Sequence, residues 1–195
     1  KVVMDAFMEG YHVQGIHPEL IGAMDESKER YTWLGDHHVA TAPFGTANSE
    51  SMSAEELVEG VRFMQTNFTG MAEVLPRFEE MVDSHRDAAG KIILPEGLTV
   101  RMLLQQATRE TLTAKGLDVS TLIDNQLSDN QFWILFPNLF ITIRAEEATC
   151  ITAVPHPDGD PNRCIWQVSI YHWLPPEERA AKRTQLTEIP EGQHV

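Results

Sequence analysis

The sequence predicts an α+β domain in which an antiparallel β-sheet carries helices on one face. Two groups of strand-like segments predict the sheet, one within residues 30–42 and a longer one from residue 131 onward. Both groups are rich in β-branched and aromatic side chains. Between them, residues 53–115 place apolar side chains at helical spacing. Strands on both sides of a helical block are typical of this fold class.

The size and composition of the chain are those of one globular domain. It has 195 residues, of which 42% are hydrophobic and 23% charged, enough to build a full core. The net charge of -14 repels nucleic-acid phosphates and anionic lipid headgroups, so we expect neither nucleic acid nor membrane as a partner. No apolar run approaches the roughly 20 residues of a membrane span, and no signal peptide is visible, which predicts a cytoplasmic location.

Two short strands are expected early in the chain. Arg30–Leu34 and His38–Ala42 are the candidates, and the turn signal Gly35-Asp36 separates them. His37 and His38 are adjacent, and adjacent residues of a strand point to opposite faces of the sheet. This pair is therefore poorly placed to bind one metal ion.

The central block predicts three helical segments. Ser53 and Glu56 form a capping box at the start of the first. A second segment is interrupted by Pro76, and residues 87–96 are expected to form a loop. The longest helix should run over Thr99–Lys115. The inward faces should hold apolar residues of all three, namely Leu57, Val61, Met64, Phe68, Val74, Phe78, Met81 or Val82, Val100, Leu103, Leu104 and Ala107.

The C-terminal part predicts an antiparallel meander with strands over residues 132–136, 139–144, 149–154 and 163–173. Asp158 and Asp160 lie in the loop before the last strand, which is expected to be a solvated turn because it lacks the bidentate Glu of a calcium loop. In that last strand, one side carries Cys164, Trp166, Val168 and Ile170, and we expect it to face a core.

The two cysteines, Cys150 and Cys164, form neither a CxxC nor a CxH pair. They are expected to be small buried hydrophobic residues.

Candidate functional residues gather within the first eighteen positions. Val3, Phe7 and Tyr11 recur every four residues and predict one face of a helix. Glu9 and His12, three apart, would then be neighbours on another face. The helix is followed by Pro18–Gly22, which predicts a short helix with proline at its first position.

His12 and His17 are the candidate metal ligands. In a continuous helix, five residues of separation would splay their side chains by roughly 140°, so the helix must end or bulge between them. Gly15 can terminate a helix, and Pro18 disfavours helical geometry at His17. Two imidazoles with a carboxylate suit non-haem iron, although imidazole also suits Zn, Cu or Ni.

The whole string DAFMEGYHVQGIHPEL, residues 5–20, resembles the iron-binding motif of the Rieske non-haem iron aromatic-ring-hydroxylating oxygenases, large (α) subunit. The family pattern is approximately N-F-x-E/D-x-Y-H-x4-H-P, and here Ala6 stands where Asn is frequent. A looser similarity lies in FWILFPN, residues 132–138, followed by LFITI, residues 139–143. It resembles a strand pair of the family around an F-P-N turn.

The resemblance implies a helix-grip (Bet v 1-like) fold, with a curved sheet around a deep apolar cavity. It implies that residues 1–195 form the catalytic domain, truncated at both ends. Neither CxH nor CxxH occurs in the chain, so the Rieske [2Fe–2S] domain of the full-length protein is expected to be absent from it.

The resemblance also implies roles for individual residues. His12 and His17 would bind a mononuclear Fe(II), and the third ligand, an Asp, is expected beyond Val195. Glu9 would bridge the iron site to the Rieske cluster of a neighbouring subunit. Phe7 and Val13 are candidate substrate-binding residues.

The activity implied is hydroxylation of an aromatic or similar apolar substrate with dioxygen. The implied partners are a reductase or ferredoxin as electron donor, and further copies in a homotrimer or an α3β3 assembly. Two other functions stay open from the residues alone: a metal-free module of the same fold that binds hydrophobic ligands, and a zinc hydrolase, which would need a third protein ligand and a general base.

Overall fold

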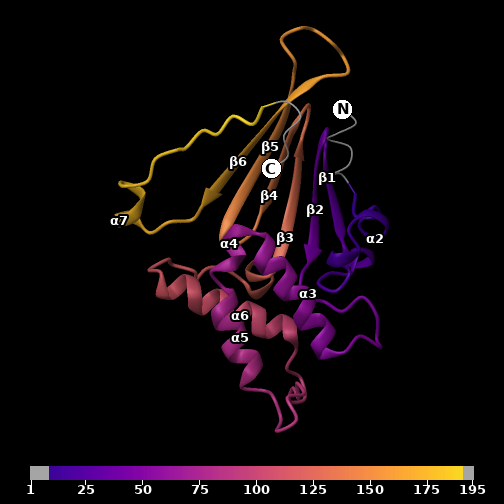
Figure 1. Ribbon diagram of the computed structural model, residues 1–195, viewed down its shortest axis with the longest axis vertical. Coiled ribbons are helices and arrows are strands. Elements are labelled where there is room, and N and C mark those ends of the chain that lie inside the picture. Colours follow the sequence, from indigo (N-terminus) through magenta and orange to yellow (C-terminus); the bar gives the residue numbers. More distant parts are fainter. Residues whose placement is uncertain (1–8, 191–195) are drawn as a thin grey trace.

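The computed structural model describes residues 9–190. Within them, six strands form one curved antiparallel sheet in strictly sequential order, β1 to β6. The strands are β1 (Arg30–Leu34), β2 (His37–Pro43), β3 (Asp129–Leu135), β4 (Leu139–Ile143), β5 (Glu147–Pro155) and β6 (Cys164–His172). This arrangement confirms the α+β prediction and is consistent with a helix-grip-like fold. Figure 1 shows the larger helices gathered at one end of the sheet.

The helices of the described part are α2 (Val13–Ile16), α3 (Ala54–Asn67), α4 (Thr69–Ala72), α5 (Leu75–Asp83), α6 (Val100–Ala114) and α7 (Pro176–Arg179), with 3-10 turns η1 (Pro18–Leu20), η2 (Glu26–Lys28) and η3 (Asp124–Leu127). The capping box of Ser53 and Glu56 starts α3 as predicted. Thr99 caps α6 by accepting a hydrogen bond from the Met102 amide. Pro76 lies in the first turn of α5, where proline is tolerated, so it starts this helix instead of interrupting one.

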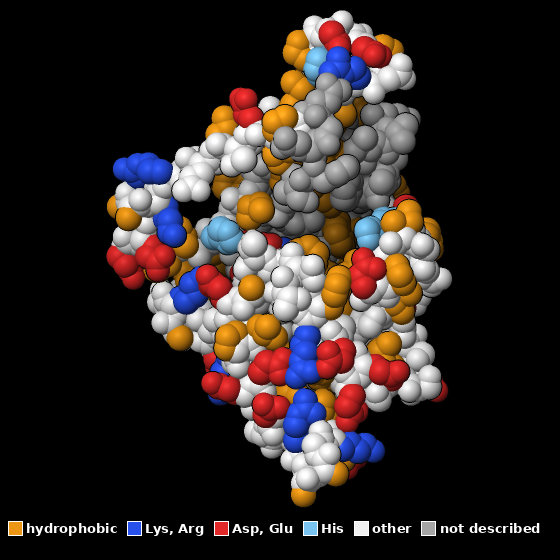
Figure 2. Space-filling view, viewed as in Figure 1, with side chains coloured by type: hydrophobic (Ala, Val, Ile, Leu, Met, Phe, Trp, Pro, Cys, Tyr) orange, Lys and Arg blue, Asp and Glu red, His pale blue; other side chains and the backbone are white. Residues whose placement is uncertain are grey.

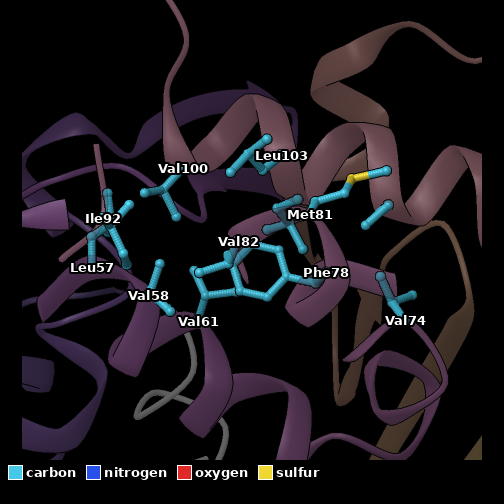
Figure 3. Packing of buried hydrophobic residues seen from close by; sticks show 12 residues of the cluster. Leu57, Val58, Val61, Val74, Phe78, Met81, Val82, Ile92, Val100 and Leu103 are labelled. Atoms are coloured by element: carbon cyan, nitrogen blue, oxygen red, sulfur yellow. The ribbon is translucent and has the colours of Figure 1, made fainter. Parts of the chain in front are cut away.

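The main core lies among α3, α5 and α6. Figure 3 shows Phe78 between Val61 and Val82, with Val100 and Leu103 reaching in from α6. Phe78 and Val82 are fully buried. The inward faces predicted for the three helices are confirmed, because their apolar residues belong to this cluster or to the neighbouring one around Met64.

The second core cluster connects the helices to the sheet. Met64 and Met71 pack with Ala42 and Phe44 of the β2 region, and Phe132 of β3 packs against them. The backbone of α3 at Gly60 packs directly against the backbone at Gly22, because a Cβ on Gly60 would lie 2.1 Å from the carbonyl carbon of Gly22. None of the helices in residues 9–190 combines the length and hydrophobicity that spanning a membrane requires.

The prediction for the last strand is wrong. All nine residues of β6 are exposed, including Trp166, Val168 and Ile170. The reason is position: β6 is an edge strand that pairs only with β5, and among the described residues no helix covers it. The alternating pattern correctly predicted a strand but gave no information about what packs against it.

The prediction that both cysteines are buried is also wrong. Cys164, at the start of β6, is exposed, and Cys150 in β5 is only half-buried. Burial nevertheless raises the pKa of the Cys150 thiol above its ordinary value. Both cysteines are free.

Candidate functional site: a pocket walled by two histidines

A pocket of about 250 Å³ opens between the N-terminal segment and the sheet. Figure 2 shows a hollow at the middle of this face with hydrophobic side chains inside it. One wall comes from the segment around α2 and includes His12, Val13 and His17, while Met64 and Phe68 of α3 contribute another side. The lining is mainly apolar, which suits a small hydrophobic ligand.

The sheet wall of this pocket is built by cross-strand rows. Phe132 of β3 pairs with Thr142 of β4, and Thr142 pairs with Thr149 of β5. The next row joins Phe140 and Ile151. All five side chains line the pocket, because alternate residues of each strand point to the same face of the sheet.

The imidazole rings of His12 and His17 lie close together at the pocket wall. Their centroids are 5.6 Å apart, and the ring planes make an angle of 74°. Both residues line the same pocket. The role of His12 and His17 as metal ligands stays a prediction.

Glu9 holds His12 through two contacts. Its Oε1 lies 2.9 Å from Nδ1 of His12, and its Oε2 accepts the backbone N–H of His12 at 3.2 Å. Burial alone would raise the pKa of Glu9, but the hydrogen bonds from His12 outweigh it and the pKa lies below its ordinary value. Since an ionised carboxylate only accepts hydrogen bonds, Nδ1 carries the proton and Nε2 of a neutral ring is left with its lone pair.

Glu19 has the corresponding position beside His17, and sequence reasoning missed it. Its Oε1 lies 3.3 Å from Nδ1 of His17. A carboxylate at the far nitrogen of a histidine is the arrangement that orients imidazole for metal binding. The available signal was the spacing His17-Pro18-Glu19, in which the proline turns the chain back and brings residues 17 and 19 together.

The helix ends before His17, at the second of the two positions expected to break it and not at Gly15. Gly15 lies inside α2, and it is not among the glycines with positive φ. The helix instead ends at His17, whose φ of −123° and ψ of 58° leave the helical region. Pro18 explains this, because its ring disfavours helical geometry in the preceding residue.

The remaining predicted residues of this segment have mixed outcomes. Val13 is buried and lines the pocket, and its role as a substrate contact stays a prediction. Phe7 and Val3 lie outside the described residues. Tyr11 is 81% exposed and precedes α2, so the apolar helix face predicted from these three positions is not formed at Tyr11.

Glu29, just before β1, and Tyr31 within it are further pocket residues that sequence reasoning missed. The hydroxyl of Tyr31 accepts the backbone N–H of Gly10 at 3.1 Å and donates to Oε2 of Glu29 at 2.5 Å. Burial raises the pKa of Glu29, and the negative charges of Glu26 and Glu9 raise it further, against the opposing hydrogen bond from Tyr31. Burial and Glu29 together raise the pKa of Tyr31. No local motif links these positions.

A buried charge cluster borders the pocket beside Phe68. Arg144 lines the pocket and forms an ion pair with Glu147, and both side chains are almost fully buried. The guanidinium carbon of Arg144 lies 4.6 Å from the centre of the Phe68 ring. Glu147 also accepts hydrogen bonds from the Gly70 amide at 2.7 Å and from the Thr69 hydroxyl. These contacts fix the charges in place.

In residues 9–190, no group of three or more His, Cys, Asp or Glu side chains is arranged to hold a metal ion. The described part therefore brings together two imidazoles and their carboxylate partners, and no third ligand.

His37 takes part in a backbone contact away from the two histidines: its Nδ1 accepts a hydrogen bond from the backbone N–H of Phe136 at 3.0 Å. The loop between β5 and β6 holds an Asp158–Arg163 ion pair.

The chain matches the family model of the ring hydroxylating alpha subunit (catalytic domain) over residues 1–189. No curated protein and no solved structure matches it. The family match spans nearly the whole chain, and includes both the histidine segment and the sheet that walls the pocket. The chain therefore belongs to the ring-hydroxylating oxygenase α-subunit family, of which it carries the catalytic domain.

Proposed function

We propose that this domain hydroxylates an aromatic or similarly apolar substrate with dioxygen, at a mononuclear Fe(II) that receives electrons from a Rieske [2Fe–2S] cluster of the full-length protein. The observation that carries this proposal is the pairing of His12 and His17. Each ring has Nδ1 beside a carboxylate, so that Nε2 is available at the wall of one apolar pocket.

The donor set fits two of the three ligands of an Fe(II) site with open positions. His12 and His17 would hold the iron through Nε2, and an Asp beyond Val195 is proposed as the third ligand. Bound there, Fe(II) would supply the site at which dioxygen is activated. A carboxylate ligand is needed because Fe(II) stands low in the affinity order of first-row metals.

The chain's own residues would prepare the site. Glu9 and Glu19 keep protons on the outer nitrogens and fix the ring orientations. The apolar rows around Phe132 and Phe140 would hold an apolar ring beside the histidines and exclude water from it.

Glu9 is proposed to connect the iron site to the Rieske cluster of a neighbouring subunit. Its side chain is 37% exposed while it contacts His12, which leaves acceptor capacity for a group from outside the domain. A donor on one chain and an acceptor on the next form a heterologous contact, which closes as a ring, so a homotrimer or α3β3 assembly is proposed. A reductase or ferredoxin would deliver the electrons, and a cytoplasmic location stays a prediction.

The test is metal analysis with turnover on the full-length enzyme. Iron together with acid-labile sulfide, and incorporation of labelled oxygen from dioxygen into an aromatic substrate, are the expected results. Stoichiometric zinc with hydrolysis would favour the hydrolase instead. A protein without metal that still binds apolar ligands would favour the binding module and overturn the oxygenase proposal.

A further inference from the structure

Glu29 is a carboxyl group on the wall of an otherwise mainly apolar pocket. One of its oxygens, Oε2, accepts the hydroxyl of Tyr31 at 2.5 Å. The carboxyl also packs against Gly10, where a Cβ would lie only 2.5 Å from the same oxygen. Tyr31 and Gly10 thus fix the position of the carboxyl group. Gly10 precedes His12 by two residues, so the carboxyl group lies at the histidine end of the pocket.

The second oxygen of Glu29 has no such partner. Among residues 9–190, nothing donates a hydrogen bond or forms an ion pair to Oε1. Oε1 is not fully buried, so it keeps access to water or to a ligand as a hydrogen-bond acceptor. The natural partner for such an oxygen in a ligand pocket is a donor group of the ligand itself.

The charges around the pocket restrict the kind of ligand. Glu9 and Glu29 both line it. Among the described lining residues, the one cationic side chain apart from the histidines is Arg144; it is paired with Glu147, and its Nε has no hydrogen-bond partner. A ligand carboxylate placed beside Glu29 would meet the like charges of Glu29 and Glu9, whereas a hydroxyl or amine placed there would not.

We propose that Oε1 of Glu29 accepts a hydrogen bond from a hydroxyl or amino group of the substrate, so that the pocket selects apolar ring compounds with one such donor. The part of this inference that concerns a substrate rests on the proposed oxygenase function. Binding selectivity, however, is a property of the pocket and is measurable without turnover. Glu29 would then be the residue that determines specificity and orients the ring with its donor group toward the histidines.

The experiment measures dissociation constants of four single-ring probes, phenol, aniline, toluene and benzoate, by calorimetry on the full-length protein. Phenol and aniline should bind about tenfold or more tightly than toluene, as expected for a hydrogen bond to a charged group. Benzoate should bind most weakly. Glu29→Leu should remove the preference for phenol over toluene, and Glu29→Gln, which keeps the shape and one acceptor, should reduce it.

Glu50→Gln is the matched control. Glu50 is an exposed carboxylate that does not line the pocket, so this variant should keep the wild-type preference. An unchanged phenol-to-toluene ratio in folded Glu29→Leu would overturn the proposal. If Glu29→Leu does not fold, two other results together would overturn the proposal. These are an unchanged phenol-to-toluene affinity ratio in Glu29→Gln, and tighter binding of benzoate than of phenol in the wild type.

The two proposals fail in different ways. Donor selectivity that depends on Glu29, in a protein that never incorporates oxygen, would leave the pocket inference standing and remove the oxygenase function. Oxygen incorporation into aromatic rings, with binding selectivity that does not depend on Glu29, would support the oxygenase function and overturn the pocket inference.

Discussion

Nδ1 of His12 lies 2.9 Å from the carboxylate of Glu9, while its ring stands at 74° to that of His17. The carboxylate thus orients one ring edge-on to the other, and the unprotonated nitrogen is turned away from Glu9. A carboxylate at the outer nitrogen fixes the orientation of a ring in the way that metal-binding histidines use, and the predictions below test whether this pair binds a metal.

Removal of either imidazole should remove iron. In the full-length enzyme, His12→Ala and His17→Ala should each bind less than about a tenth of the wild-type iron, since even loss of a supporting group costs about 10- to 100-fold in metal affinity. Mass spectrometry for metals measures this directly. His156→Ala, in the loop between β5 and β6, is the control and should retain iron. An active His12→Ala variant without iron would refute the ligand assignment.

Glu9→Gln should separate iron binding from electron transfer. The amide keeps the shape of the side chain but forms weaker hydrogen bonds with imidazole than a carboxylate does. We expect iron to stay bound while coupled turnover slows about tenfold or more. Iron content, product formation and reduction of the Rieske cluster should be measured together. Loss of iron in this variant would instead make Glu9 a ligand or a determinant of the fold.

Glu19→Gln should weaken metal binding through His17. Without the negative charge at 3.3 Å from Nδ1, the ring is held less firmly, and iron affinity should fall by about tenfold. Competition with a chelator measures the affinity, and exposed Glu50→Gln is the control. Equal iron affinity in Glu19→Gln and wild type would show that the His17–Glu19 contact has no such role.

Glu146 should make stability depend on pH. Burial raises the pKa of this carboxyl from 4.5 to about 7, and only Arg144 and a backbone hydrogen bond oppose the shift. The folded chain therefore holds this proton more tightly than the unfolded chain does. The contribution of Glu146 to the free energy of unfolding is fully present below about pH 4.5 and is lost as the pH rises through about 7. The contribution lost is about 3 kcal/mol.

Urea denaturation between pH 4.5 and pH 8 measures this contribution. Glu146→Gln has no proton to lose, so the difference in unfolding free energy between variant and wild type should grow in favour of the variant as the pH rises. Exposed Glu96→Gln should follow the wild-type curve. A parallel curve for Glu146→Gln would mean that the carboxyl titrates normally in the folded protein.

Gly60→Ala should destabilise the fold. The added Cβ would lie 2.1 Å from both the carbonyl carbon and the oxygen of Gly22, so backbone must move, at a cost of about 2 kcal/mol or more. Gly15→Ala is the contrasting control, because no atom lies within 4 Å of its added Cβ. Thermal unfolding should place Gly60→Ala well below Gly15→Ala, and similar midpoints would contradict the contact.

The elements predicted best from the sequence are those whose ends are set by local contacts. Ser53 and Glu56 satisfy each other's hydrogen-bonding groups within one helical turn, and Thr99 caps α6 in the same way. Nothing distant is required for these bonds to form. The predicted boundaries of α3 and α6 therefore agree closely with the structure.

Features that depend on distant segments were not predictable. Glu29 contacts the pocket because β1 packs beside Gly10, and no periodicity connects these positions. The exposure of Trp166 likewise depends on what covers β6, which the alternation of its side chains does not record. The histidine pair was predicted by its motif, whereas the carboxylate at Glu19 needed the turn at Pro18 to be seen.

The sheet joins two parts of the chain that the helical block separates. Ala40 of β2 pairs with Phe132 of β3, yet the segment from residue 44 to residue 128 lies between these strands. Hairpins such as β3–β4 close short loops and can form quickly, whereas pairing of β2 with β3 must close a very long one, which is entropically costly. Both Ala40 and Phe132 line the pocket, so the pocket is absent from any intermediate that has only its local hairpins and helices. The capacity to bind a ligand should therefore be among the last properties gained during folding, and among the first lost when β2 and β3 separate.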